Sequence, residues 1–229
     1  MAGIKVLDLS SFFERVRGQV RIDSLRASWL IYGEGFRQGL SRALVKRVFD
    51  LVASFVLLVL ATPVMLLAAL LIVLEDGAPV FYRQERVGQG GRLFKVIKFR
   101  SMRRDAERDG KPRWASANDD RVTRVGRFIR KVRIDELPQL FNVLRGDMSL
   151  VGPRPITLAE LPRYGQVRWH YLSVRPGMTG LWQVSGRNDT TYDERVELDR
   201  EFVEQHSLRL RLSILLRTLR VVIRGSGAR

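Results

Sequence analysis

The sequence predicts an α/β domain that is associated with a membrane, and three observations lead to this fold class. An apolar run without a single charge extends from Leu51 to Leu74. Between residues 79 and 145, two short strand patterns separated by Gly90-Gly91 are followed by two helical patterns. The tail from Leu208 to Ile223 repeats apolar and basic residues with helical periodicity, which is typical of a helix lying in a membrane interface.

The composition indicates anionic partners. The chain of 229 residues has 40 Lys+Arg against 24 Asp+Glu and a formal charge of +16. This excess suits a solvated basic surface or a specific site for nucleic acid, an anionic membrane or phosphorylated substrates. The absence of cysteine excludes disulfides, thiolate metal sites and cysteine nucleophiles, and only two histidines argue against a multi-histidine metal site.

The apolar run has two interpretations. As one helix it would be about 36 Å long, enough to cross a hydrocarbon core of about 30 Å, so a plain transmembrane helix is the simpler interpretation. A re-entrant helix is favoured by Pro63, which removes a backbone donor near the middle, while Thr62 can bond the freed carbonyls. Both flanks are basic, and the positive-inside tendency places both on the cytoplasmic side.

The tail also has two interpretations. Its apolar stripe can lie in the membrane interface with the arginines directed towards anionic lipid, or it can dock on the core of the domain. The apolar stripe consists of Leu208, Leu212, Leu215, Leu219 and Val222, and the polar stripe of Arg209, Ser213, Arg217, Arg220 and Arg224.

Asp135 and Glu136 are the candidate reactive residues. Pro138 belongs in a first helical turn, which makes Asp135 a natural N-cap of a helix over 138–145 that Gly146 closes, and such a cap needs no chemistry. The basic surroundings favour chemistry, because a carboxylate among guanidinium groups lies where phosphate would bind and can attack phosphorus. Mg²⁺ would screen the two negative groups from each other. The basic neighbours are Arg130, Lys131, Arg133, Arg145 and Arg154.

Several motifs follow one another in a fixed order along roughly four fifths of the chain. They are KRxxD (Lys46, Arg47, Asp50), the Thr62-Pro63 step, FYRQERVG, KFRSM (Lys98 to Met102), DELPQLFNVLRGDMS, VGPRP, VRPGMTG and GRN (Gly186 to Asn188). In this order they resemble the bacterial sugar transferase family, the monotopic phosphoglycosyl transferases. The segment SGRNDTTYDERVELD resembles the branch of the family that transfers hexose 1-phosphates. Arg209 and Arg211 depart from the family, where many relatives have an apolar residue and Asp.

The resemblance implies a two-step reaction at the bacterial inner membrane, on its cytoplasmic face. Asp135 matches the nucleophile that attacks the β-phosphate of a UDP-hexose and releases UMP, and polyprenyl phosphate then takes the sugar phosphate. Glu136 matches the dyad partner that helps to bind Mg²⁺ and to activate the acceptor, so both acids are the implied metal ligands. Such a reaction begins the assembly of exopolysaccharide, capsule or O-antigen glycans. The implied phosphate-binding residues are Arg130 and Arg154, with Lys98, Arg100 and Arg175 in motifs near the site.

The resemblance also implies four segments and a set of partners. Residues 1–45 form a linker of unassigned role, 46–76 the re-entrant helix with its break at Thr62-Pro63, 77–207 the catalytic domain and 208–229 the interfacial helix. The partners are the UDP-hexose, polyprenyl phosphate and anionic lipid, without nucleic acid, and a homo-oligomer is left open. The rival is a non-enzymatic basic membrane- or nucleic-acid-binding protein, which explains the charge but not an acidic pair among arginines.

Overall fold

The computed structural model describes residues 40–106, 119–186, 190–205 and 207–224. It separates into two units, Met1–Lys46 and Arg47–Arg229. Most of the predicted N-terminal segment 1–45 therefore lies outside the described residues, and the candidate site belongs to the second unit. In chain order the elements are α3 (Leu40–Asp76), β1 (Phe81–Val87), η3 (Gln89–Gly91), β2 (Leu93–Phe99), α4 (Arg124–Lys131), η4 (Ile134–Glu136), α5 (Gln139–Arg145), β3 (Ser149–Val151), η5 (Leu161–Val167), α6 (Arg168–Ser173), β4 (Gly177–Thr179), α7 (Leu181–Val184), α8 (Tyr192–Gln205) and α9 (Leu208–Arg224).

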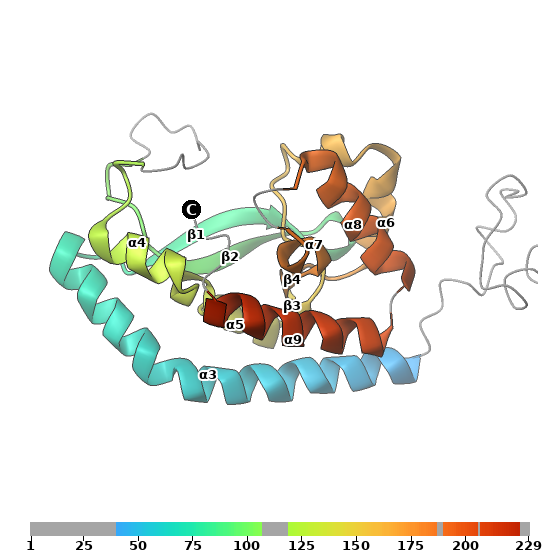
Figure 1. Cartoon of the computed structure of the whole chain (residues 1–229), viewed down its shortest axis with the longest axis horizontal. Coiled ribbons are helices and arrows are strands. Elements are labelled where there is room, and N and C mark those ends of the chain that lie inside the picture. Colours follow the sequence, from blue (N-terminus) through green and yellow to red (C-terminus); the bar gives the residue numbers. More distant parts are fainter. Residues whose placement is uncertain (1–39, 107–118, 187–189, 206, 225–229) are drawn as a thin grey trace, which may run out of the picture. The chain divides into compact units, whose positions relative to one another are not determined.

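The apolar run forms one long helix, α3, of 37 residues with Pro63 in its interior. Thr62 Oγ1 donates a 2.7 Å hydrogen bond to the carbonyl oxygen of Leu58, one turn earlier. Figure 1 shows that α3 bends between its two halves without being interrupted. A proline inside a helix removes one hydrogen bond and produces such a bend, so the expected break is a bend in a continuous helix. The part Ala43–Asp76 is long and apolar enough to cross a membrane, by length and composition.

The first half of α3 is tied to the end of α5 and the start of β3. Arg47 donates hydrogen bonds of 2.7 and 2.9 Å to the carbonyl oxygens of Val143 and Leu144, in the last turn of α5. The buried carboxylate of Asp50 accepts a 3.4 Å hydrogen bond from the backbone N–H of Leu150. The two Arg47 bonds add donors from outside the helix to carbonyls of the last turn of α5.

The other end of α3 is tied to α4 and β2 of the same unit. The Glu75 carboxylate accepts hydrogen bonds from the backbone N–H groups of Arg124 and Val125, at 2.8 and 2.9 Å. These two groups belong to the first turn of α4, where backbone donors need outside acceptors. Arg100, directly after β2, donates to the carbonyl oxygen of Asp76 at 3.0 Å. Both halves of the long helix are therefore held by one folded unit (Figure 1).

The predicted strands and the helix that follows the acidic pair are confirmed, and one buried amide joins them. β1 and β2 form an antiparallel hairpin around Gly90-Gly91. α5 ends at Gly146, which has φ 96° and is the C-cap. Asn142 on α5 accepts from the N–H of Ile97 at 3.0 Å and donates to the carbonyl of Lys95 at 2.8 Å. These bonds fix β2, and with it the neighbouring Lys98, against α5.

A short parallel pair, β3 and β4, brings two loops into contact. Ser149 lies opposite Gly177, and Val151 opposite Thr179. The backbones approach closely just beyond the pair, because a Cβ atom on Gly177 would lie 2.1 Å from the backbone nitrogen of Gly152. Glycine is needed at this contact, since any side chain there would separate the loops. The VGPRP and VRPGMTG motifs are thus neighbours in space.

The tail helix α9 docks on the core by one face and exposes an apolar surface on another. Ile214 is fully buried and belongs to the main core cluster, against which Leu215 also packs. Leu215 of the predicted apolar stripe therefore follows the second interpretation, in which the tail docks on the core. Among the side chains described on α9, Leu212, Leu216 and Leu219 are exposed.

Asp199 on α8 predicts a measurable pH dependence of stability. It is 1% exposed and accepts a 2.9 Å hydrogen bond from the Tyr164 hydroxyl, and burial raises its pKa from 3.8 to about 7. Between these values the folded chain keeps a proton that the unfolded chain releases, so the free energy of unfolding falls as the pH rises through this range. We expect Asp199→Asn to remove this component and to be more stable than the wild type above pH 7, by on the order of 1–3 kcal/mol.

Thermal unfolding in detergent at pH 5 and pH 8 measures this difference. An Asp199→Asn variant whose midpoint differs from the wild type by the same amount at both pH values would show that Asp199 does not titrate in this range.

Candidate active site

The acidic pair lies on the three-residue turn η4, between α4 and α5. Arg133 precedes the turn with φ 63°, and it is the one non-glycine residue with a positive φ among the residues described. This left-handed residue ends α4 and redirects the backbone into a 3₁₀ turn that holds Asp135 and Glu136. The expectation that Asp135 caps the next helix was wrong, because the N-cap position of α5 is Pro138.

Glu136 is the point at which cations from three parts of the chain meet. Lys98 Nζ, on β2, lies 3.0 Å from Glu136 Oε1. Arg154 Nη2, from the loop after β3, lies 3.3 Å from the same oxygen. Arg133 Nη1 lies 3.7 Å from it. These contacts neutralise one carboxylate of the pair and leave the second with a different environment.

The two carboxyl groups consequently have opposite pKa shifts. Burial disfavours the charged form of Glu136, but the charges of Lys98, Arg154 and Arg133 outweigh it and hold the pKa of Glu136 well below its ordinary value. Burial raises the pKa of Asp135 to about 6, and the negative charge of Glu136 adds to the rise. Asp135 is thus still ionised at pH 7 but is the more basic of the two carboxylates.

Asp135 also carries a buried oxygen that has no partner in the described part of the chain. Its Oδ1 is buried and has no hydrogen-bond partner among the described residues. A buried carboxylate oxygen without a partner is costly unless a ligand or an ion completes the site. Two adjacent carboxylates, one with a free oxygen, fit the donor set that Mg²⁺ takes from proteins, which is one or two carboxylates with substrate oxygens. The residues therefore fit a divalent cation held by Asp135 and Glu136.

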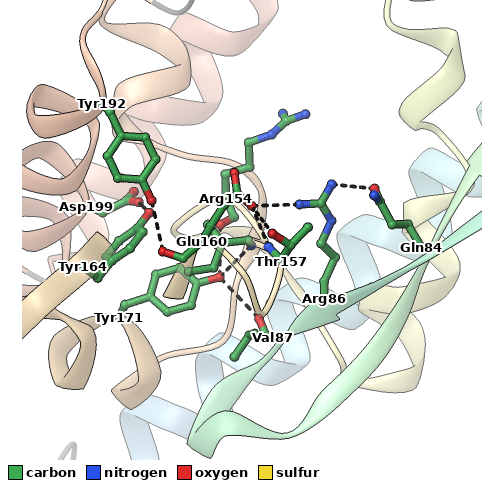
Figure 2. A network of polar contacts seen from close by, with 11 residues as sticks. Gln84, Arg86, Val87, Arg154, Thr157, Glu160, Tyr164, Tyr171, Tyr192 and Asp199 are labelled. Atoms are coloured by element: carbon green, nitrogen blue, oxygen red, sulfur yellow. Dashed lines mark hydrogen bonds and ion pairs between the residues drawn. The ribbon is translucent and has the colours of Figure 1, made fainter. Parts of the chain in front are cut away.

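The loop that carries Arg154 is held from behind by Tyr171 (Figure 2). The buried Tyr171 hydroxyl accepts a 3.1 Å hydrogen bond from the N–H of Ile156. It can donate to the carbonyl of Arg154 at 3.1 Å or to that of Val87 at 3.3 Å. The side chain of Arg154 points away from this network in Figure 2, so the network fixes its backbone and leaves its guanidinium group directed elsewhere.

Glu160 closes the same loop a few residues later. Its Oε2 accepts hydrogen bonds from the backbone N–H and the hydroxyl of Thr157, at 2.7 and 2.8 Å. Arg86 on β1 lies 3.3 Å from the same oxygen, and Arg86 also donates to Gln84 (Figure 2). The loop after β3 is thereby joined to the β1–β2 hairpin, which carries Lys98.

The family model described as bacterial sugar transferase matches residues 41–225. The chain belongs to the bacterial sugar transferase family. An undecaprenyl-phosphate galactose phosphotransferase of Salmonella typhimurium is 47% identical over 82% of this chain and 42% of its own length. The exopolysaccharide production protein ExoY of Rhizobium meliloti is 42% identical over 81% of this chain and 88% of its own length.

A third relative aligns with the whole chain. It is the UDP-N-acetylgalactosamine-undecaprenyl-phosphate N-acetylgalactosaminephosphotransferase of Aeromonas hydrophila, which is 40% identical over 100% of this chain and 55% of its own length. The chain spans less than half the length of the Salmonella protein, at 42%. Membership of the sugar transferase family confirms the resemblance found in the motifs.

In this sugar transferase, the predicted site residues do not all gather at the dyad. Lys98 and Arg154 contact Glu136 directly. Arg130, in the last turn of α4, acts on Asp135 by its charge and lowers the pKa of that carboxyl, against the larger effect of burial. Arg100 instead donates to backbone carbonyls at the end of α3. Arg175 instead acts on Asp50, in the first half of α3, where its positive charge lowers the pKa of that carboxyl against the larger effect of burial.

Two residues near the dyad were not assigned from the sequence. From the sequence, Arg133 is only a basic neighbour of the acidic pair. Its position three residues before Glu136 is the sequence feature that could have predicted their ion pair. Nothing in the sequence around Trp182 places it near the dyad, because its position depends on the contact between β3 and β4. The Cζ atom of Arg154 lies 5.9 Å from the centroid of the Trp182 ring.

The unequal environments of the two acids predict opposite effects on stability. Glu136→Gln leaves three cations around a neutral amide, so we expect it to lower the free energy of unfolding by about 1–2 kcal/mol, less than for a fully buried pair because the partners are partly exposed. Asp135→Asn removes a buried charge next to a like charge, so we expect it to raise the unfolding midpoint. Thermal unfolding in detergent at pH 7.5 without added metal measures the stability of both variants. A lower unfolding midpoint for Asp135→Asn than for the wild type would contradict the expected repulsion between the two carboxylates.

Proposed function

We propose that the chain transfers a hexose 1-phosphate from a UDP-hexose to polyprenyl phosphate, releasing UMP. The observation that carries this proposal is the Asp135 carboxyl group with a buried, unpartnered oxygen, set beside a second carboxylate that three cations contact. The names of the relatives, which specify sugar phosphotransferases acting with undecaprenyl phosphate, support the substrates. The product would begin the assembly of an exopolysaccharide, capsule or O-antigen glycan.

In the first step, an oxygen of Asp135 attacks the β-phosphorus of the donor. The new bond joins the carboxylate oxygen to phosphorus, and the bond from that phosphorus to the bridging oxygen breaks. UMP leaves with the electron pair, and the sugar phosphate stays on Asp135 as an acyl phosphate. The raised pKa of Asp135 makes its carboxylate a better nucleophile than an ordinary aspartate, while it remains charged at pH 7.

In the second step, a phosphate oxygen of the lipid acceptor attacks the same phosphorus. The bond to Asp135 breaks, the carboxylate is restored, and polyprenyl-diphosphate-sugar is released. Lys98 and Arg154 lie where they can neutralise phosphate oxygens during both steps, since each is already within 3.3 Å of Glu136. Glu136 keeps these cations in position, and its charge would orient the acceptor.

Mg²⁺, held by Asp135 and Glu136, would supply further positive charge that screens the carboxylates from the donor phosphates. The protein's own part is to bring Asp135 into line with the phosphorus and to surround the phosphates with Lys98, Arg130 and Arg154. The tight packing of the loop after β3 against Tyr171 serves this positioning.

The anchoring of α3 supports a re-entrant arrangement in the inner membrane, with the site on the cytoplasmic face. Arg47 and Glu75 lie near the two ends of the helix, and both bond the same folded unit. If the helix crossed the bilayer, its two ends would lie on opposite sides, and a unit on one side could not bond both. The apolar surface of α3 would enter the lipid, and exposed leucines of α9 would lie in the interface above anionic lipid. The exposed apolar residues of α3 include Leu44, Val52, Phe55, Leu60, Leu66 and Leu74.

Cysteine labelling tests this topology, because the chain contains no cysteine of its own. We expect single cysteines at Ser41 and Gln89 to resist a membrane-impermeant thiol reagent on intact cells and to react in inside-out vesicles. Labelling of the two positions from opposite sides would mean that the helix spans the bilayer. Replacing Thr62-Pro63 by Leu-Leu should shift the helix towards spanning, since the bend is then lost.

A burst experiment tests the nucleophile. Donor and Mg²⁺ without acceptor should release up to about one UMP per active enzyme and leave a hexose phosphate on the protein, as a two-step reaction requires. Asp135→Asn should abolish the burst, because a neutral amide is a poor nucleophile, while the variant stays folded. Quenched-flow measurement of UMP and mass spectrometry of the protein provide the two readouts.

Asp147→Asn is the matched control for this experiment. Asp147 follows α5 and accepts a 3.2 Å hydrogen bond from Asn142, outside the dyad, so its burst should persist. An adduct on Asp147, or substantial turnover by Asp135→Asn, would assign Asp135 a purely structural role.

A further inference from the structure

An indole ring and two guanidinium groups form a cluster next to the dyad. The Cζ of Arg195 lies 4.8 Å from the centroid of the Trp182 ring, and the Cζ of Arg154 lies 5.9 Å from it. Trp182 is on α7 and Arg195 on α8, and these helices pack against each other. Trp182 is only partly buried, so part of its surface is open to a ligand. Neither Trp182 nor Arg195 takes part in the two transfer steps.

The position of this cluster relative to the dyad is fixed by the backbone. Arg154 contacts Glu136 Oε1 at 3.3 Å and also lies over the Trp182 ring, so one side chain separates the ring from the reacting centre. α7 follows β4 almost directly, and β4 pairs with β3, which leads into the Arg154 loop. The distance between Trp182 and the dyad therefore depends on strand pairing more than on side-chain rotamers.

We propose that Trp182 and Arg195 form the subsite for the nucleotide half of the donor, its uridine 5′-monophosphate unit. This inference rests on the proposed transfer from a UDP-sugar. When the β-phosphorus lies at Asp135, the α-phosphate and the nucleoside must extend beyond the dyad. Arg154 contacts Glu136 and also lies at the Trp182 ring, where Arg195 adds a second guanidinium group. Guanidinium groups bind phosphate oxygens, and aromatic rings stack on bases.

Two similar pairs elsewhere in the unit provide matched controls. Arg168 lies 4.7 Å from the ring centroid of Trp169, which is 65% exposed on α6. Arg163 lies 5.3 Å from the ring centroid of Tyr192. Both pairs have the chemistry of the proposed subsite, but neither includes a residue that contacts Glu136 or Arg154 among the contacts described for this unit.

Binding of UMP and of inorganic pyrophosphate to the full chain in detergent with Mg²⁺, measured by calorimetry, tests the proposal. We expect Trp182→Leu to weaken UMP binding about tenfold, as the loss of one base–aromatic stack implies. Pyrophosphate binding should be almost unchanged, because it has no base. Trp182→Phe should retain most of the UMP affinity, and Arg195→Gln should lose part of it. The controls Trp169→Leu and Arg163→Gln should bind UMP as the wild type does.

Three outcomes would overturn the proposal. Equal losses for UMP and pyrophosphate in Trp182→Leu would mean that the ring only holds Arg154 in place. Unchanged UMP binding in Trp182→Leu, or an equal loss in Trp169→Leu, would mean that no nucleoside binds at Trp182. If Trp182→Leu does not fold, UMP binding by Arg195→Gln is compared with UMP binding by Arg163→Gln. Equal UMP affinities of these two variants would then overturn the proposal. Absence of UMP release from UDP-hexoses by the wild type would instead refute the proposed function, independently of these affinities.

Discussion

A buried carboxyl group and a largely buried one lie side by side on one short turn, and such a pair would repel strongly unless one charge were neutralised. Lys98, Arg154 and Arg133 converge on a single oxygen of Glu136 and provide that neutralisation. The charge of Asp135 is neutralised much less, and its buried Oδ1 has no partner in the described unit. The remaining architecture serves this arrangement, because β2 and the β3–β4 pair come from distant parts of the sequence and each brings one cation to the turn.

The long helix is part of the same construction. Its first half bonds the end of α5, and its second half bonds the start of α4, so α3 runs alongside the two helices that flank the dyad turn. Arg100, two residues beyond Lys98, bonds the end of α3 and fixes the end of β2 against it. The site and the apolar run of the helix therefore belong to one folded unit.

Much of this arrangement could be predicted from local features of the sequence. The remainder depends on contacts between segments that are distant in the sequence. The hairpin, α5 and its Gly146 cap followed from turn residues and periodicity, and the acidic pair stood out among arginines. The helix-capping role of Asp135 could not be judged from the sequence, because an arginine at φ 63° before the turn has no sequence signature. Arg100 shares a motif with Lys98, yet β2 ends between them at Phe99 and the two side chains serve different parts of the unit.

The contact between Gly152 and Gly177 has a consequence for how the site can change in evolution. The two loops touch through their backbones, at a separation that admits no side chain. One loop carries a cation of the reacting centre, and the other leads into the helix with Trp182. Side chains around the dyad can therefore vary, whereas the backbone spacing between the Arg154 loop and α7 cannot change without replacing the strand pair. In the proposed complex, this strand pair would set the distance between the phosphate that reacts and the nucleoside.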